Sequence, residues 1–201
     1  GNRGRDYSEG TISIEIDAEN PDTIYIATGV ERHGNYYSAC VLKSTDSGTT
    51  WNETDLNPET FQKNYYISDM IQNPLTPTTL FCLVNFEFRG KGAKIMRTIN
   101  GGREWTESLN IPEGNDRERL FKIEMHPVDP NIIYVSGSGL YRTINNGTSW
   151  VDITNKIVPD LANYYLERAT ISINPDNPQK ILVIRRMVNR TNSNDVSASI
   201  L

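Results

Sequence analysis

The sequence has few residues that bind metals and no long apolar runs. It holds two cysteines and two histidines among 201 residues. A structural zinc site needs four ligands. Two cysteines supply only half of them, and the sequence has only two histidines to help. No apolar run exceeds a handful of residues, which excludes a transmembrane helix. We therefore expect no metal, no cofactor and no membrane insertion.

Positive charge is also scarce. Lys and Arg number 20 against 25 Asp and Glu, which gives a net charge of −5. A protein that depends on phosphate neutralisation is basic, so a nucleic-acid partner is not expected. The chain is 37% hydrophobic and carries 10 Tyr, 5 Phe and 3 Trp. That composition can bury a core and is not typical of a disordered segment.

One phrase recurs four times along the chain: an alternating strand, a turn that contains proline, and a second apolar strand. The copies occupy residues 14–26, 70–82, 123–135 and 171–183. Their equivalent prolines are 56, 53 and 48 residues apart, at Pro21, Pro77, Pro130 and Pro178. Proline lacks an N–H donor, so it belongs in the connection between two strands. A period of about 50 residues predicts β-propeller blades of four strands.

A second motif, S/T-x-D/N-x-G-x-x-W, follows in three of the repeats. Its Asp or Asn can close a turn onto backbone N–H groups two residues on, and the preceding hydroxyl can bond the same turn. Its glycine supplies the positive φ of a tight hairpin, and its tryptophan can place its ring between neighbouring sheets. The positions are Ser44, Asp46, Gly48 and Trp51; Thr98, Asn100, Gly102 and Trp105; and Thr143, Asn145, Gly147 and Trp150.

This motif resembles the Asp-box, or BNR, repeat of β-propellers. Families that carry it include sialidases, xyloglucanase-type glycoside hydrolases, sortilin-type receptors and photosystem II assembly factors. Residues 20–25 and 129–134 are most similar to the xyloglucanase and sortilin branch. The resemblance implies a structural role for the Asp-box residues, because in these families the motif is a folding element away from the active site. It also implies an extracellular or cell-surface location.

The expected fold is all-β, a β-propeller segment of about three and a half four-stranded blades. Residues 1–10 form a lead-in, and the blades cover 11–57, 58–110, 111–155 and a partial 156–201. The fourth repeat has no Asp-box and ends in the polar stretch 189–199. A propeller ring closes with four to eight blades, and open sheet edges invite pairing. We therefore expect the partners to include the remaining blades of the same chain, or a protein.

The predicted working face carries the longer connections, at residues 29–38, 52–65, 84–92, 106–119 and 151–167. Loops on a rigid scaffold are where binding residues concentrate. Tyrosine offers an apolar ring with a hydroxyl, which suits sugars or peptides, although these tyrosines could instead pack the connections onto blade edges. The candidate binding residues are Arg32, His33, Tyr36, Tyr37, Phe88, Arg89, Arg117, Tyr164 and Tyr165.

Catalysis is not expected in this segment, and no catalytic residue is assigned. A glycosidase needs two carboxylates roughly 5 Å apart if retaining, or about 6.5–9.5 Å if inverting. Acidic residues such as Glu31, Glu87 and Glu167 lie in the connections, but their spacing pairs no two of them. We therefore predict a non-catalytic interaction module for a protein, peptide or glycan. The alternative is a segment of a xyloglucanase-like or other glycoside hydrolase.

Two further residues are predicted to be structural. His126 stands where Asn73 and Asn174 begin the turns of other repeats, so we expect it to serve the turn. Cys82 takes the place of Ile26, so we expect a small buried side chain.

Overall fold

The computed structural model describes residues 11–32, 35–57, 60, 65–86, 92–112 and 119–200. In this part of the chain the backbone forms fifteen strands and one 3₁₀ helix, η1 (Thr154–Lys156). No helix among these residues is long and apolar enough to cross a membrane. The expected all-β class is confirmed.

The strands form four antiparallel sheets, and in each the strand order follows the chain. The first sheet contains β1 (Thr11–Ile16), β2 (Ile24–Arg32), β3 (Asn35–Ser44) and β4 (Asn52–Glu53). The second contains β5 (Tyr65–Gln72), β6 (Leu80–Phe86), β7 (Ala93–Thr98) and β8 (Thr106–Ile111). The third contains β9 (Leu120–Met125), β10 (Ile133–Gly137), β11 (Leu140–Thr143) and β12 (Val151–Asp152). The fourth contains β13 (Tyr164–Ile173), β14 (Ile181–Asn189) and β15 (Val196–Ile200).

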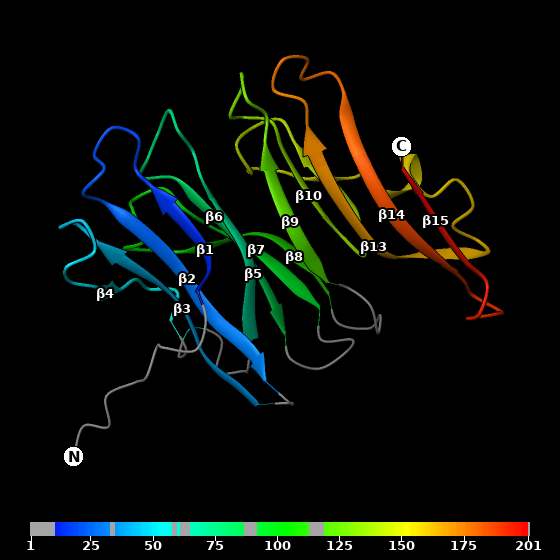
Figure 1. The fold of residues 1–201 in the computed structure, drawn as a ribbon, viewed down its shortest axis with the longest axis horizontal. Helices are drawn as coiled ribbons and strands as arrows, with labels where there is room; N and C mark the ends of the chain where they lie inside the picture. Colours follow the sequence, from blue (N-terminus) through cyan, green and yellow to red (C-terminus); the bar gives the residue numbers. More distant parts are fainter. Residues whose placement is uncertain are drawn as a thin grey trace. The chain divides into compact units, whose positions relative to one another are not determined.

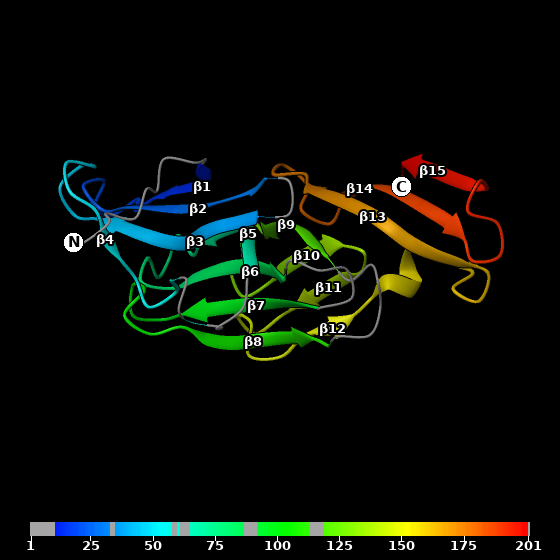
Figure 2. The same cartoon turned by 90° about the horizontal axis from the view of Figure 1, so that it is seen from below.

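The chain divides into two compact units. The first unit comprises residues 1–88 and 94–107, and the second comprises 89–93 and 108–201. In the first unit, β5 packs against β1, β2 and β3 (Figure 1). In the second unit, β13 packs against β9 and β10, and β13, β14 and β15 run side by side (Figure 2). In both units the first strand of one sheet therefore packs against the sheet that precedes it in the chain.

The turn between the first two strands of each sheet is closed by one side-chain acceptor. The acceptors are Asp17, Asn73, His126 and Asn174. In the third sheet Nδ1 of His126 accepts the backbone N–H groups of Val128 and Asp129, at 3.3 and 3.0 Å. A neutral imidazole nitrogen can accept such bonds as an Asn oxygen does. His126 thus serves the turn, as expected.

Each unit has its own apolar core, built from alternate strand positions that face the neighbouring sheet. The first core contains Tyr25, Ala27, Val41, Leu56, Tyr65, Ile67, Met70, Leu80, Cys82, Val84 and Met96. The second contains Leu140, Ile157, Val158, Leu166, Ala169, Ile171, Val183 and Met187. Cys82 is fully buried with a free thiol, as expected, and burial raises its pKa. Burying one such Leu or Ile side chain contributes about 1.5–3 kcal/mol.

Parts of the expected connections are strands instead. The connection expected at 29–38 is largely a hairpin, because β2 runs to Arg32 and β3 begins at Asn35, with Val30 opposite Tyr37. The connection expected at 151–167 overlaps β13, which begins at Tyr164. Aromatic and β-branched residues favour the pleated conformation, so these segments extend the ladders.

The polar stretch expected to end the fourth repeat also contains a strand. β15 pairs with β14, with Val196 opposite Val188 and Ile200 opposite Ile184. Its apolar and serine residues alternate with the period of two that a strand requires. The alternation covers five residues, which is too short to stand out in a polar segment.

Candidate functional site

The Asp-box of the first sheet is a closed hydrogen-bonded turn. The Ser44 hydroxyl donates to Oδ1 of Asp46 at 2.7 Å and accepts the Gly48 N–H at 2.9 Å. Asp46 then accepts the Thr50 N–H at 2.8 Å and the Thr50 hydroxyl at 2.6 Å. The prediction that Asp46 accepts the N–H of the second residue after it is wrong. Its carboxylate accepts the N–H of the fourth residue after it, Thr50. The Ser44 hydroxyl accepts the nearer N–H groups instead, those of Asp46 and Gly48.

These bonds stabilise the charged form of Asp46. The bonds from the Thr50 side chain and backbone, followed by that from Ser44, lower its pKa from 3.8 to about 2. A carboxylate that accepts several hydrogen bonds holds its proton less readily.

The other two Asp-boxes repeat this geometry with asparagine. Their hydroxyls accept the glycine N–H at 3.0 and 3.1 Å, and their Asn Oδ1 atoms accept the N–H four residues on at 3.0 and 2.9 Å. The residue before each box glycine also has a positive φ, of 56°, 69° and 53° at Ser47, Gly101 and Asn146. The second box is the one that places glycine there.

Two of the three Asp-box tryptophans, Trp105 and Trp150, bond a hydroxyl of the preceding sheet. Nε1 of Trp105 donates to Oγ1 of Thr54 at 3.2 Å in the first unit. Nε1 of Trp150 donates to Oγ of Ser108 at 2.8 Å in the second. Thr54 and Ser108 each lie three residues after the tryptophan of their own repeat. The tryptophan thus ties its Asp-box to the outgoing strand of the sheet before it.

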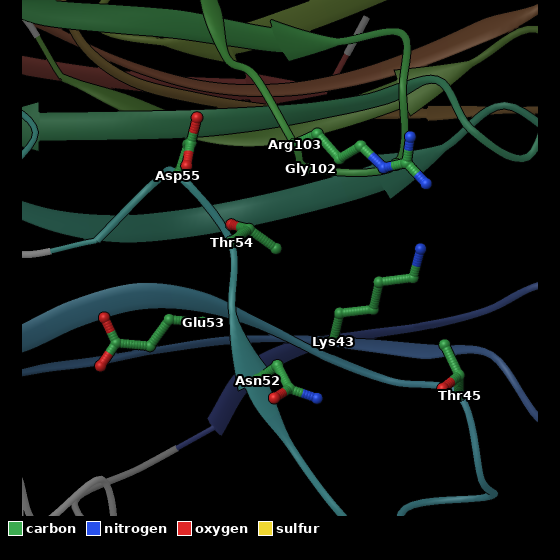
Figure 3. Close-up of a pocket in the computed structure, with 9 residues that line it drawn as sticks. Lys43, Thr45, Asn52, Glu53, Thr54, Asp55, Gly102 and Arg103 are labelled. Carbon is green, nitrogen blue, oxygen red and sulfur yellow. The ribbon is translucent and has the colours of Figure 1, made fainter.

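A pocket of about 370 Å³ lies beside the Trp105–Thr54 hydrogen bond of the first unit. It lies between the outgoing strand of the first sheet and the Asp-box of the second (Figure 3). We call it the Gly101 pocket. It is lined by Lys43, Thr45, Asn52, Glu53, Thr54, Asp55, Gly101, Gly102 and Arg103.

Two side chains crowd the position where a Cβ on Gly101 would lie. The Lys43 amine lies over the Tyr25 ring, 5.2 Å from its centroid, and the two residues pair across β2 and β3. A Cβ placed on Gly101 would lie 3.0 Å from the Tyr25 hydroxyl and 3.1 Å from the Lys43 amine. Tyr25 is 1% exposed and belongs to the core of the first unit.

The charges of the Gly101 pocket are separated. Figure 3 shows the Lys43 amine and the Arg103 guanidinium on one side, and the Glu53 and Asp55 carboxylates on the other. The two carboxylates point in different directions and do not face each other across the pocket. The pocket therefore has a cationic end and an acidic end.

Of the sequence-predicted binding residues, the structure describes the side chains of Tyr164 and Tyr165. His33, Phe88, Arg89 and Arg117 lie outside the described residues, and so do the side chains of Arg32, Tyr36 and Tyr37 on β2 and β3. Tyr164 and Tyr165 lie on β13, where the Tyr164 hydroxyl donates to Asp195 at 3.2 Å. The Arg190 guanidinium lies over the Tyr165 ring at 5.9 Å. Their binding role stays a prediction.

The Gly101 pocket was missed by the sequence reasoning. The available signal was the Gly-Gly pair at 101–102 followed by Arg103, which breaks the pattern of the other two Asp-boxes. Within the described residues no group of three or more His, Cys, Asp and Glu side chains is placed to hold a metal ion.

Known proteins resemble this chain in structure rather than in sequence. No protein-family model matches the sequence, and no curated protein does so. An ancestral GH74 enzyme matches with a TM-score of 0.59 and 14% identity, over 94% of this chain and 25% of that chain. YCF48 from Cyanidioschyzon merolae matches with a TM-score of 0.56 and 16% identity, over 96% and 57%. The GH74 xyloglucanase from Xanthomonas campestris matches with a TM-score of 0.53 and 14% identity, over 94% and 38%.

The chain has the fold of the Asp-box β-propellers. The propeller resemblance drawn from the repeats is thereby confirmed, and each of the four sheets corresponds to a blade. The chain spans between 25% and 57% of the length of these three proteins. Its structural neighbours include both glycoside hydrolases and YCF48, so the likeness establishes the propeller fold alone.

Proposed function

We propose that this propeller segment is a non-catalytic interaction module that binds a polypeptide in the Gly101 pocket. The observation that carries the proposal is the pocket itself, with its cationic and acidic ends. Ligand pockets commonly have volumes of roughly 300–1,000 Å³. A volume of about 370 Å³ accommodates a few residues of a peptide.

The outer strand of the first sheet favours a polypeptide over other ligands. β4 is the last strand in the order β1-β2-β3-β4, so it is an edge strand. An edge strand can add an extended peptide through main-chain hydrogen bonds, while neighbouring pockets select its side chains. Asn52 and Glu53 belong to β4 and also line the pocket. A peptide paired with β4 would thus reach the charged groups directly.

One structural neighbour supports this choice. The structure of YCF48 bound to D1 peptide matches with a TM-score of 0.50 and 13% identity, over 95% of this chain and 53% of that chain. A propeller of this type can therefore serve as a peptide-binding scaffold. The predicted loop face remains a candidate second contact surface, and an extracellular or cell-surface location stays a prediction from the sequence.

The glycoside hydrolase alternative has less support in the described residues. A glycosidase needs two carboxylates that face each other across the scissile bond. Glu53 and Asp55 line the same pocket, yet their carboxylates point apart (Figure 3). We therefore propose binding rather than hydrolysis at this site.

The test is a selection of random heptapeptides displayed on phage against the immobilised 201-residue chain. The enriched peptide is then synthesised, and its dissociation constant is measured by fluorescence anisotropy. We expect Lys43→Glu and Arg103→Glu each to weaken binding about tenfold or more, because a lost charge-assisted bond has that effect. Lys180→Glu, an exposed charge reversal in the second unit, is the matched control and should change nothing.

Two results would contradict the proposal. One is a selection that enriches no peptide, or a peptide whose affinity is the same for the pocket variants and the wild type. The other is release of reducing sugar from xyloglucan oligosaccharides by the purified chain, which would support the hydrolase alternative.

A further inference from the structure

The first and the fourth sheet each carry an uncovered apolar surface. Ile12, Ile14 and Ile16 of β1 are 40%, 58% and 57% exposed, and we call them the β1 face. Leu182 and Ile184 of β14 are both 47% exposed, and we call them the β14 face. We propose that the β1 face of one copy of the chain binds the β14 face of a second copy. Neither face includes a residue of the Gly101 pocket, so this interaction is separate from the proposed function.

The fourth sheet shows what kind of surface the β1 face is. Counted from the equivalent prolines of the two repeats, Ile14 and Ile16 correspond to Ile171 and Ile173 of β13. Ile171 and Ile173 are only 4% and 8% exposed, and their strand packs against β9 and β10 of the third sheet. The β1 face is therefore the surface that this fold buries against a preceding sheet.

The first sheet shows the same for the β14 face. Leu182 and Ile184 correspond to Tyr25 and Ala27 of β2. Tyr25 and Ala27 are 1% and 0% exposed, and they belong to the core where β2 packs against β5 of the following sheet. The β14 face is therefore the surface that a following sheet covers. The two uncovered faces are the two halves of a contact that the chain makes once within each unit.

Trp51 points to the same unfilled contact before the first sheet. It is 37% exposed, and its ring lies 3.4 Å from the position of a Cβ on Gly48, the glycine of its own Asp-box. In the second Asp-box, the equivalent position at Gly102 is contacted by the Thr54 side chain of the preceding sheet. A sheet placed before the first one would thus cover an indole ring as well as the isoleucines.

Charge favours a second copy as the source of that sheet. The first sheet with its turns, residues 11–32 and 35–57, has eight Asp and Glu against two Lys and Arg. The fourth sheet, residues 164–200, has three Asp and Glu against five Lys and Arg. Opposite charges attract across an interface and suppress the wrong pairing. Two copies of four sheets supply eight, which lies within the range of roughly four to eight blades in closed propellers.

The test is cross-linking between copies through introduced cysteines. Cys40 and Cys82 are buried, so the wild-type chain treated with a short bismaleimide linker is the blank. A mixture of Ile14→Cys and Leu182→Cys chains should give a covalent pair, seen as a doubled mass by denaturing electrophoresis and mass spectrometry. Each variant alone should give no such product, because the contact is heterologous and brings two different surfaces together.

Two control variants locate the contact. Leu75→Cys, at an exposed turn position, should not cross-link to Leu182→Cys. Ile16→Lys added to the Ile14→Cys chain should abolish the pair, because it would bury an unpaired charge in the apolar contact. The thermal midpoint of each variant, measured by circular dichroism, verifies that it folds.

Three results would overturn the inference. The first is cross-linking of Ile14→Cys alone as strong as in the mixture, which would show that two β1 faces meet. The second is a pair that persists with Ile16→Lys. The third is no product above the blank, in which case blades of another sequence cover the two faces. None of these results changes peptide binding at the Gly101 pocket, which the peptide selection tests separately.

Discussion

Asp46 is the one Asp-box acceptor that carries a charge. Its hydrogen bonds from Thr50 and Ser44 lower the pKa from 3.8 to about 2 in the folded chain. Because the folded pKa lies below the unfolded value, this stabilisation is complete above about pH 4 and is lost as the pH falls toward 2. In the second and third Asp-boxes, Asn100 and Asn145 make the equivalent hydrogen bonds without a titrating group.

Asp46→Asn should therefore remove part of the acid sensitivity of the chain. We expect the wild type to be more stable than the variant near pH 6, and the difference to shrink between about pH 4 and pH 2. Urea unfolding midpoints at several pH values measure this. Asn100→Asp is the converse variant and should gain a pH dependence of the same sign. A difference that stays constant with pH would contradict the assigned bonds.

At the scale of single residues, much of the Asp-box was predictable. The hydroxyl, Asp or Asn, and glycine are local in sequence, and their turn chemistry follows from residue type. The Gly101 pocket was not predictable, because it depends on Tyr25 and Lys43 from one sheet meeting a turn of another. Such contacts between repeats leave no periodic signal in a single sequence.

Among the elements, the bond between Trp105 and Thr54 links two sheets of the first unit. Thr54→Val keeps the shape of the side chain and removes the acceptor of the indole N–H. We expect it to lower the free energy of unfolding by about 1–3 kcal/mol, because the partly buried donor is left without a partner. Thr54→Ser keeps the hydroxyl and should cost less.

Urea unfolding followed by tryptophan fluorescence checks this expectation. A double-mutant cycle with Trp105→Phe should give a coupling energy of about 0.5 kcal/mol or more, since the two side chains are in contact. A loss of stability for Thr54→Ser with none for Thr54→Val would show that the methyl group matters, and not the bond.

The elements themselves were predicted unevenly. The repeated strand–turn–strand phrase located the first two strands of every sheet, because apolar alternation and proline turns are strong local signals. The hairpin that extends through Val30 and Tyr37, and strand β15, were not anticipated. Their residues are mixed with polar ones, and their pairing is decided by the adjacent strand rather than by their own sequence.

For the whole molecule, the outer face of β1 is an uncovered apolar surface. Ile12, Ile14 and Ile16 are 40%, 58% and 57% exposed. Alternate residues of this strand face the second sheet, where the Ser13 hydroxyl donates to the backbone carbonyl of Met70. In a propeller the other face of a blade packs on the blade before it. We therefore expect a further blade to cover this row.

The isolated 201-residue chain should accordingly self-associate as its concentration rises, because exposed apolar sheet faces pair. Sedimentation velocity should show a concentration-dependent increase in mass for the wild type and a monomer for Ile14→Lys with Ile16→Lys. Leu75→Lys, at an exposed turn position, is the control and should associate like the wild type. A wild-type chain that remains monomeric would contradict this expectation.

The central claim is that a polypeptide binds between the outgoing strand of the first sheet and the second Asp-box. Hydrogen–deuterium exchange of the chain, with and without the phage-selected peptide, tests it most directly. We predict slower exchange at residues 52–55 and 101–103 in the presence of the peptide, and loss of that protection in Arg103→Glu. Protection confined to other segments, or none at saturating peptide, would contradict the claim.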